Sequence, residues 1–170
     1  AGILGITQDD LSSDLPFESA VADFVHLIVP VKGITSMRSI NPDFPAIVSF
    51  CHSIGVQTIA TFSTETEVQE NNIHVRDFCP VVGVAESAAA GTTNAALASY
   101  LIRNNLVQPD RQGNIRVIAE QGLEINRPST IFSRVGIADG RIAELMVGGV
   151  ASKVMEGTLF LPPEIKMNGS

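Results

Sequence analysis

The stretch RDFCPVVGVAESAAAGTTNAALASYLIR, residues 76–103, combines three elements that together decide the fold. The segment Ile73–Phe78 alternates in polarity and predicts a strand, and the Pro and Gly residues after it predict a loop. A run of small and apolar residues then extends from Gly91 to Ile102, with almost no polar face before Arg103. A helix that is apolar on nearly all sides is normally surrounded by protein. We therefore expect a buried helix that begins directly after the loop.

The start of this helix is the first candidate site. Gly91, Thr92, Thr93 and Asn94 form its first turn, where backbone N–H groups have no intrahelical partner and no bulky side chain covers them. Such a turn suits an anion, for example a substrate carboxylate or phosphate. Thr92 and Thr93 add hydroxyl groups that can bond a bound oxygen. The alternative interpretation, an ordinary capped helix with small residues for packing, stays open.

Two nearby residues are candidates for acid/base chemistry. Glu86 lies five residues before Gly91, and a partly desolvated carboxylate beside an anion site can act as acid or base. The alternative is a surface loop glutamate. Cys79 ends the strand that leads into the loop, where it is either a proton-transfer thiolate or a small buried residue.

Composition narrows the possible partners. The chain has 170 residues, 45% hydrophobic and 17% charged, with only 11 Lys and Arg and a net charge of −7. This leaves little material for a basic face, so nucleic acid and anionic membranes are not expected partners. We expect neither a membrane span nor a signal peptide. The two cysteines and three scattered histidines predict free thiols, a cytoplasmic location and no metal site.

The rest of the chain predicts an α+β fold with a mostly antiparallel sheet. Mixed strands and helices come first and a run of strands follows, which argues against a doubly wound parallel sheet. A sheet curled into a barrel around the apolar helix would satisfy both observations. The expected further elements are a strand at Val21–Val31, a helix at Asp43–Ile54, a strand at Val56–Phe62, and strands at Ile115–Ala119, Thr130–Val135, Ile142–Val147 and Ser152–Leu161, with a hairpin turn at Asp139-Gly140.

Motifs in three segments resemble a known family. They are His26-Leu27-Ile28-Val29-Pro30-Val31; Arg76-Asp77-Phe78-Cys79-Pro80 with Gly83, Glu86 and Gly91; and Glu120-Gln121-Gly122, Glu124, Arg127-Pro128-Ser129, Asp139-Gly140-Arg141, Val147-Gly148-Gly149 and Met155-Glu156-Gly157. Together they resemble the PhzF-like family of phenazine biosynthesis, which shares the diaminopimelate epimerase fold. The second segment is similar to the family pattern R-x-F-A-P…G…E-D-P-x-T-G-S-A.

The resemblance implies that residues 1–170 form a single domain similar to the C-terminal domain of a two-domain protein. In that family the active site lies in the cleft between the domains, and the other domain supplies the glutamate that acts as acid/base. No cofactor is implied. The implied partners are a small carboxylate substrate and either the missing N-terminal half or another copy of this chain.

The chain departs from the family pattern at several positions, among them Asp23, which stands where the family usually has a glycine. Ser87 stands where the family has an aspartate in its active site, and Thr92 replaces a serine but keeps the hydroxyl. Ala90 occupies the position of the catalytic cysteine of the diaminopimelate epimerases, so two-cysteine racemase chemistry is not expected.

Two functions follow from these observations. The first is an isomerase or epimerase lobe with a biosynthetic role. In it, Gly91, Thr92, Thr93 and Asn94 bind the substrate carboxylate, and Glu86 and Ser87 support proton transfer. The alternative is a non-catalytic relative that binds a small molecule or another protein and has lost the family's aspartate. Because an isolated half would expose apolar surface, a homo-oligomer is expected.

Overall fold

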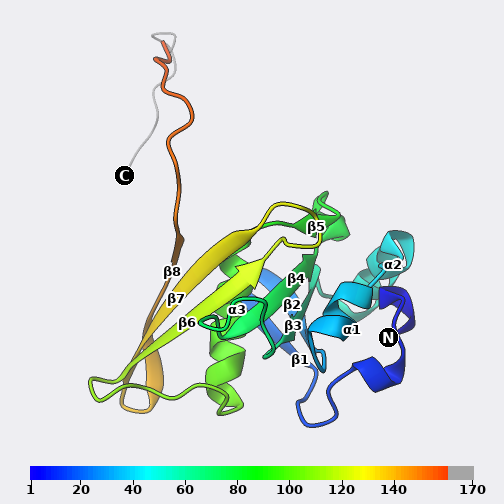
Figure 1. Cartoon of the computed structure of the whole chain (residues 1–170), viewed down its shortest axis with the longest axis horizontal. Coiled ribbons are helices and arrows are strands. Elements are labelled where there is room, and N and C mark those ends of the chain that lie inside the picture. The colour runs from blue at the N-terminus through cyan, green and yellow to red at the C-terminus, as the bar shows by residue number, and fades with distance from the viewer. Residues whose placement is uncertain (161–170) are drawn as a thin grey trace.

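A computed structural model of the chain describes residues 1–160 (Figure 1). One mixed sheet dominates the molecule, as expected for the α+β class. Its elements, in chain order, are η1 (Gly2–Leu4), η2 (Gln8–Asp10), β1 (Glu18–Ala22), β2 (Phe24–Pro30), α1 (Ile34–Ser39), α2 (Phe44–Ile54), β3 (Thr58–Ser63), β4 (Ile73–Phe78), η3 (Pro80–Val82), β5 (Glu86–Ser87), α3 (Gly91–Arg103), β6 (Asn114–Gln121), β7 (Ser129–Ala138) and β8 (Arg141–Gly149).

The sheet is a half-barrel that curls around α3. Its strand order is β1-β2-β3-β4-β6-β7-β8, and the short β5 pairs with β4. The pairings are antiparallel except β2–β3 and β4–β6, which are parallel. Strands from both ends of the sheet, β1 and β2 on one side and β7 and β8 on the other, contact α3. The expected sheet curled around the apolar helix is confirmed. Within residues 1–160 it forms a half-barrel and not a full barrel, because β1 and β8 remain the two edges of the strand order.

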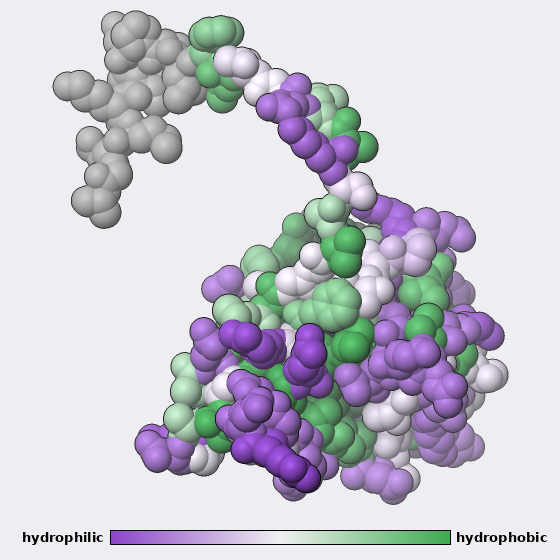
Figure 2. Space-filling model, turned by 60° about the vertical axis from the view of Figure 1, so that its left-hand side comes forward, coloured by the Kyte–Doolittle hydropathy of each residue, from purple (hydrophilic) through white to green (hydrophobic). Residues whose placement is uncertain are grey.

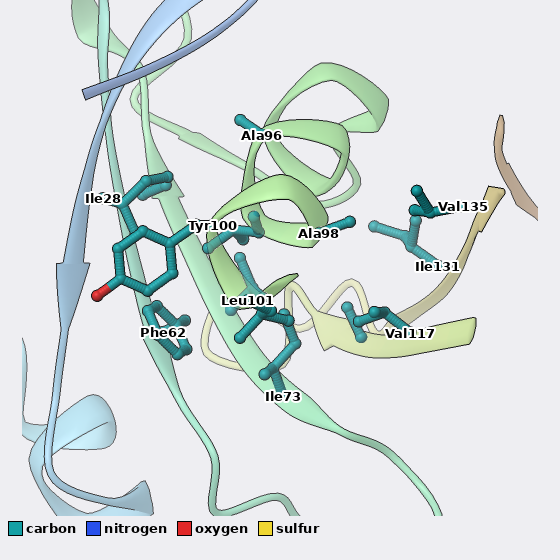
Figure 3. Packing of buried hydrophobic residues seen from close by; sticks show 14 of the residues in the cluster. Ile28, Phe62, Ile73, Ala96, Ala98, Tyr100, Leu101, Val117, Ile131 and Val135 are labelled. Carbon is teal, nitrogen blue, oxygen red and sulfur yellow. The ribbon is translucent and has the colours of Figure 1, made fainter. Parts of the chain in front are cut away.

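The central helix is buried, as its composition predicted. Leu97 and Ala98 have no exposed surface, and Leu101 is 1% exposed. Figure 3 shows α3 between side chains from the surrounding strands, with Tyr100 close to Phe62 at a ring-centroid distance of 5.5 Å. Burying a leucine-sized side chain contributes about 1.5–3 kcal/mol, so this face anchors the fold. The helix start therefore occupies a fixed place in the molecule.

A second core lies on the other face of the sheet, under α1 and α2. Alternate strand residues point to opposite faces, so β3 gives Ala60 and Phe62 to the α3 side and Ile59 to the α1/α2 side. The helix expected at Asp43–Ile54 is confirmed as α2. Asp43 caps it, because its Oδ1 accepts a hydrogen bond from the backbone N–H of Ala46 at 3.0 Å.

The sheet contains two tight hairpins, β7–β8 and β1–β2. The turn expected at Asp139-Gly140 is confirmed: both residues have positive φ, 50° and 70°, and they join β7 to β8. The single strand expected over Val21–Val31 is wrong. Asp23 adopts φ 60° and reverses the chain, so that β1 and β2 form an antiparallel pair. Aspartate tolerates this left-handed conformation better than most residues.

The strand expected at Ser152–Leu161 is also wrong over the residues that the structure describes. Residues 150–160, here called the arm, contain no regular element, and Leu161 lies outside the described residues. Figures 1 and 2 show the arm leaving the body beyond β8, with hydrophobic and hydrophilic residues along it. Its apolar side chains are almost fully exposed, from Leu159 at 81% to Val154 at 97%. Their pattern favours a strand, but residues 1–160 contain no strand that pairs with them.

Candidate functional site

Strand β4 carries the polar side chains that shape the candidate site, and it alternates between the two faces of the sheet. Val75 and Asp77 point toward α3, whereas His74 and Arg76 point toward the other face. All four are 5% exposed or less. Buried ionisable groups are costly unless they are paired, so each is expected to have a specific partner.

Asp77, on β4, hydrogen-bonds a side chain of the first turn of α3. The hydroxyl of Thr93 donates a hydrogen bond to Oδ2 of Asp77 at 2.9 Å, and Thr93 is 1% exposed. Beside them, Oγ1 of Thr58 lies 2.7 Å from Nδ1 of His26, whose ring is fully buried. Burial raises the pKa of Asp77 to about 6 and lowers that of His26. Both shifts favour the neutral form of the side chain, as expected for ionisable groups that are removed from water.

Asn94 fixes the same turn from a second direction. Its side-chain amide donates to the carbonyl of Ala90 at 2.9 Å and to Oε1 of Gln121 at 3.0 Å. Gln121 in turn donates to the backbone carbonyl of Ser87 at 2.7 Å. The side chains of Thr93 and Asn94 are thus engaged inside the protein, and the structure leaves Gly91 and Thr92 at the surface end of the helix.

The N-terminus of α3 opens on a pocket. Ala90 occupies the N-cap position, and no side chain caps the helix. Within residues 1–160, no acceptor meets the backbone N–H groups of Gly91 and Thr92. The adjoining pocket has a volume of about 460 Å³ and is lined by residues 89–91, 128–131 and 147–150. The positive end of the helix dipole therefore faces an open, solvent-accessible space.

A second pocket of about 460 Å³ continues from the first, since both are lined by Ala89, Pro128 and Ser129. The predicted residues Glu86 and Ser87 line one wall of the second pocket. The exposed Arg127 lines the other wall. The structure thus brings Glu86, Ser87 and Gly91 together around one continuous hollow. The sequence had given no role to Arg127 or Ser129. The parallel pairing of β4 with β6 brings the loop that carries them to the pockets.

Glu86 is bound within an ion pair. Nε and Nη2 of Arg76 each donate to one carboxylate oxygen of Glu86 at 2.9 Å, and the Glu86 side chain is 5% exposed. Nη1 of Arg76 donates to the carbonyls of Met37 and Ile40 at the end of α1. This bidentate pair fixes the loop before α3. It also occupies both oxygens of the carboxylate that the sequence suggested as an acid or base.

The thiol of Cys79 is kept protonated. Its side chain is 5% exposed, and burial, with the nearby charges of Asp77 and Glu86, raises its pKa to about 12. A thiol with this pKa is almost entirely neutral at physiological pH. Of the two interpretations of Cys79, the structure favours the small buried residue.

No group of three His, Cys, Asp or Glu side chains within residues 1–160 is arranged to hold a metal ion. None of the helices in this part of the chain is both long and apolar enough to cross a bilayer.

The fold and the pockets define the chain as an α+β half-barrel with a central helix whose uncapped N-terminus borders a hollow. Residues 1–157 match the family described as phenazine biosynthesis-like protein, PhzC-PhzF, and the chain therefore belongs to this family. The resemblance noted in the sequence is confirmed.

Relatives and a solved structure agree with this assignment. The chain is 26% identical over 149 residues to "Uncharacterized isomerase YddE" of Escherichia coli K12, covering 87% of this chain and 49% of that protein. It is 28% identical over 136 residues to a trans-2,3-dihydro-3-hydroxyanthranilate isomerase of Pseudomonas aeruginosa, covering 80% and 45%. A PhzF family protein of Bacillus anthracis superposes with a TM-score of 0.70 at 20% identity, covering 88% and 54%, which supports the fold. The chain spans about half the length of the curated relatives it matches.

Proposed function

We propose that this lobe binds the carboxylate of a small substrate at the N-terminus of α3 and supports a cofactor-independent proton transfer, as one half of an isomerase active site. The observation that carries the proposal is the uncapped first turn of α3 at the edge of a pocket large enough for a small organic acid. Pockets of roughly 300 Å³ and above are typical of small-molecule sites.

The first turn of α3 would provide charge complementarity. The N–H groups of Gly91 and Thr92 and the hydroxyl of Thr92 have no partner among residues 1–160. An oriented donor of this kind can contribute about 3–4 kcal/mol when negative charge develops next to a carboxylate during proton abstraction. Thr93 and Asn94 would act indirectly, by holding the turn in place.

The remaining roles follow from the walls of the second pocket. Arg127 would attract the acid, and Ser87 would offer a hydroxyl. Because Arg76 binds both oxygens of Glu86, we assign Glu86 an electrostatic and structural role, and the principal acid/base group to a second lobe. The name of the Pseudomonas relative describes an isomerase of a cyclic acid, which is consistent with a carboxylate substrate.

The test is a titration of the full chain with benzoate as a probe acid, followed by nuclear magnetic resonance. Amide signals of Gly91 and Thr92 are expected to shift. Thr92→Val should weaken binding by roughly 1–2 kcal/mol, a factor of about 5 to 30, because it removes one hydrogen bond. Thr35→Val is the matched control, since Thr35 is the second residue of α1 as Thr92 is of α3.

Unchanged signals at Gly91 with saturating benzoate would contradict the binding proposal. Binding with the expected Thr92 dependence, but without proton exchange in the protein that contains the second lobe, would instead support the non-catalytic binder.

A further inference from the structure

His74 lies between two carboxylates and makes a close contact with each. It is fully buried on β4, with Nδ1 2.8 Å from Oε1 of Glu120 and Nε2 2.8 Å from Oε1 of Glu124. An ionised carboxylate only accepts hydrogen bonds, and a neutral imidazole donates from only one nitrogen. Both contacts are therefore made at once when the ring carries a proton on each nitrogen.

Glu120 is the fixed side of this arrangement. Its two oxygens also accept from the backbone N–H groups of Glu67 at 2.6 Å and Val68 at 3.1 Å, and from the amide of Asn71 at 2.7 Å. Burial alone would raise the pKa of Glu120, but these bonds and the one to His74 outweigh it and the pKa is lowered. Glu120 thus stays charged and anchored without depending on His74 alone.

Glu124 depends on His74 much more. Within residues 1–160, His74 is the one side chain that hydrogen-bonds Glu124, and the buried Oε2 of Glu124 has no hydrogen-bond partner. Among residues 1–160 the one other cation paired with Glu124 is Arg76, whose Nε is 4.0 Å from Oε2 and already donates to Glu86. A change at His74 therefore acts mainly on Glu124.

Glu124 belongs to the loop that forms one wall of the pocket. The loop closes where the backbone N–H of Arg127 donates to the carbonyl of Gly122 at 2.9 Å. Arg127, Pro128 and Ser129 then line the second pocket, and Pro128 and Ser129 also line the first. The position of Glu124 therefore helps to determine the position of the pocket wall formed by residues 127–129.

We propose that His74 and Glu124 are positioning residues: the doubly protonated ring of His74 holds Glu124, and with it the Arg127–Ser129 wall, and loss of one ring proton releases that wall. The proposal rests on the proposed function only in taking this pocket as the ligand site.

The direction of the pH dependence follows from the groups around the ring. Burial lowers the pKa of His74, but the hydrogen bonds that the ring donates to Glu124 and Glu120, and the charges of these two carboxylates, outweigh it, so that the net shift is upward from 6.5. Arg76 and its partner Glu86 reach the ring only through Glu124. The wall is therefore held at low and neutral pH and released as the pH rises through the elevated pKa of His74.

The experiment follows the ¹⁵N shifts of the His74 ring and amide exchange at residues 122–129 in the full chain, from about pH 6 to about pH 9. Each exchange rate is taken relative to the rate of an unstructured peptide at the same pH, because hydroxide catalysis alone accelerates amide exchange as the pH rises. We expect both ring nitrogens to be protonated at the low end, and exchange at 122–129 to accelerate with the midpoint of the ring titration. Benzoate affinity should fall roughly tenfold over the same range, as for loss of a charged buried hydrogen bond.

Glu124→Gln keeps the shape of Glu124 but changes the proton requirement. Its amide can donate to an unprotonated Nε2 while Nδ1–H still donates to Glu120, so a neutral ring suffices. In this variant exchange at 122–129 and benzoate affinity should no longer follow the titration of His74. Glu144→Gln is the control, because Glu144 forms an exposed pair with Arg134 and should leave the wild-type profile unchanged.

A ring that is neutral at about pH 6, or exchange at 122–129 that is the same at both ends of the range, would overturn the proposal. If exchange follows the ring but benzoate binds at neither pH, the positioning role stands and the proposed function fails. If benzoate binds equally at both pH values and the wall does not change, the proposed function stands and the positioning role fails.

Discussion

Asp77 illustrates, at the scale of one residue, how a buried carboxyl group couples folding to pH. It is 2% exposed, Oδ2 accepts a hydrogen bond from Thr93, and Oδ1 has no partner among residues 1–160. Burial raises the pKa from 3.8 to about 6. Between these two values the folded chain holds a proton that the unfolded chain has released, so the stability falls as the pH rises.

This shift predicts the effect of Asp77→Asn. Ionisation of Asp77 should cost the wild type about 3 kcal/mol of stability between pH 3.8 and about pH 6. The asparagine can still accept from Thr93 but does not ionise. Urea titrations give the free energy of unfolding of each protein. The value for the wild type minus the value for the variant should therefore decrease over this pH range and become constant above it.

Asp9→Asn, at an exposed position in η2, is the control for this measurement. A difference between wild type and Asp77→Asn that does not vary with pH would mean that folding leaves the pKa of Asp77 unshifted.

The candidate site was only partly predictable from its residues. The small and hydroxyl residues of Gly91–Asn94 indicated an open helix start because they follow from local composition. The inward direction of Thr93 and Asn94 could not be predicted, because it depends on Asp77 and Gln121, which the fold brings to the helix. Arg127 was missed for the same reason, since its place in one pocket with Glu86 and Ser87 depends on strand pairing.

At the scale of elements, Gly122 is where the two walls of the site meet. It has φ +80°, and a Cβ there would lie 2.4 Å from the carbonyl oxygen of Arg127 and 2.8 Å from that of Ala88. Only glycine fits this close approach of two backbone segments.

Gly122→Ala should lower the free energy of unfolding by roughly 2 kcal/mol or more, since backbone strain and a steric clash add up. Gly83→Ala is the matched control: its φ is +89°, but nothing lies within 4 Å of the added Cβ. Urea unfolding of both variants separates strain from clash. Equal losses would mean that the two walls do not touch at Gly122.

Elements with strong local signals were predicted well, and those that depend on partners were not. α2 has Asp43 as its N-cap and Gly55 directly after its last residue, and α3 has an uninterrupted apolar surface, so both follow from the sequence. The β1–β2 hairpin was missed because its turn is one aspartate inside an apolar run. The strand expected in the arm was wrong because a strand needs a neighbour, which residues 1–160 do not supply.

At the scale of the whole molecule, the arm predicts self-association. Val154 is 97% exposed, Met155 88% and Phe160 87%, which is costly for a chain in water. The full chain should sediment as a dimer or larger. Val154→Ser combined with Met155→Ser should shift it toward monomer, because the variant exposes less apolar surface.

Val68→Ser is the control, since Val68 is 49% exposed but lies in the loop before β4. A wild-type chain that sediments as a monomer at high concentration would contradict this prediction.

The enclosure of α3 by strands from both ends of the sheet has a consequence for biosynthesis on the ribosome. The helix ends at Arg103, but β7 and β8, which cover one of its sides, are completed only at Gly149. Translation proceeds at roughly 5–20 residues per second, so the nascent helix waits for several seconds with that side bare. During this interval the emerging chain is a natural client for chaperones that hold apolar segments, and slow translation of residues 104–149 would prolong its exposure.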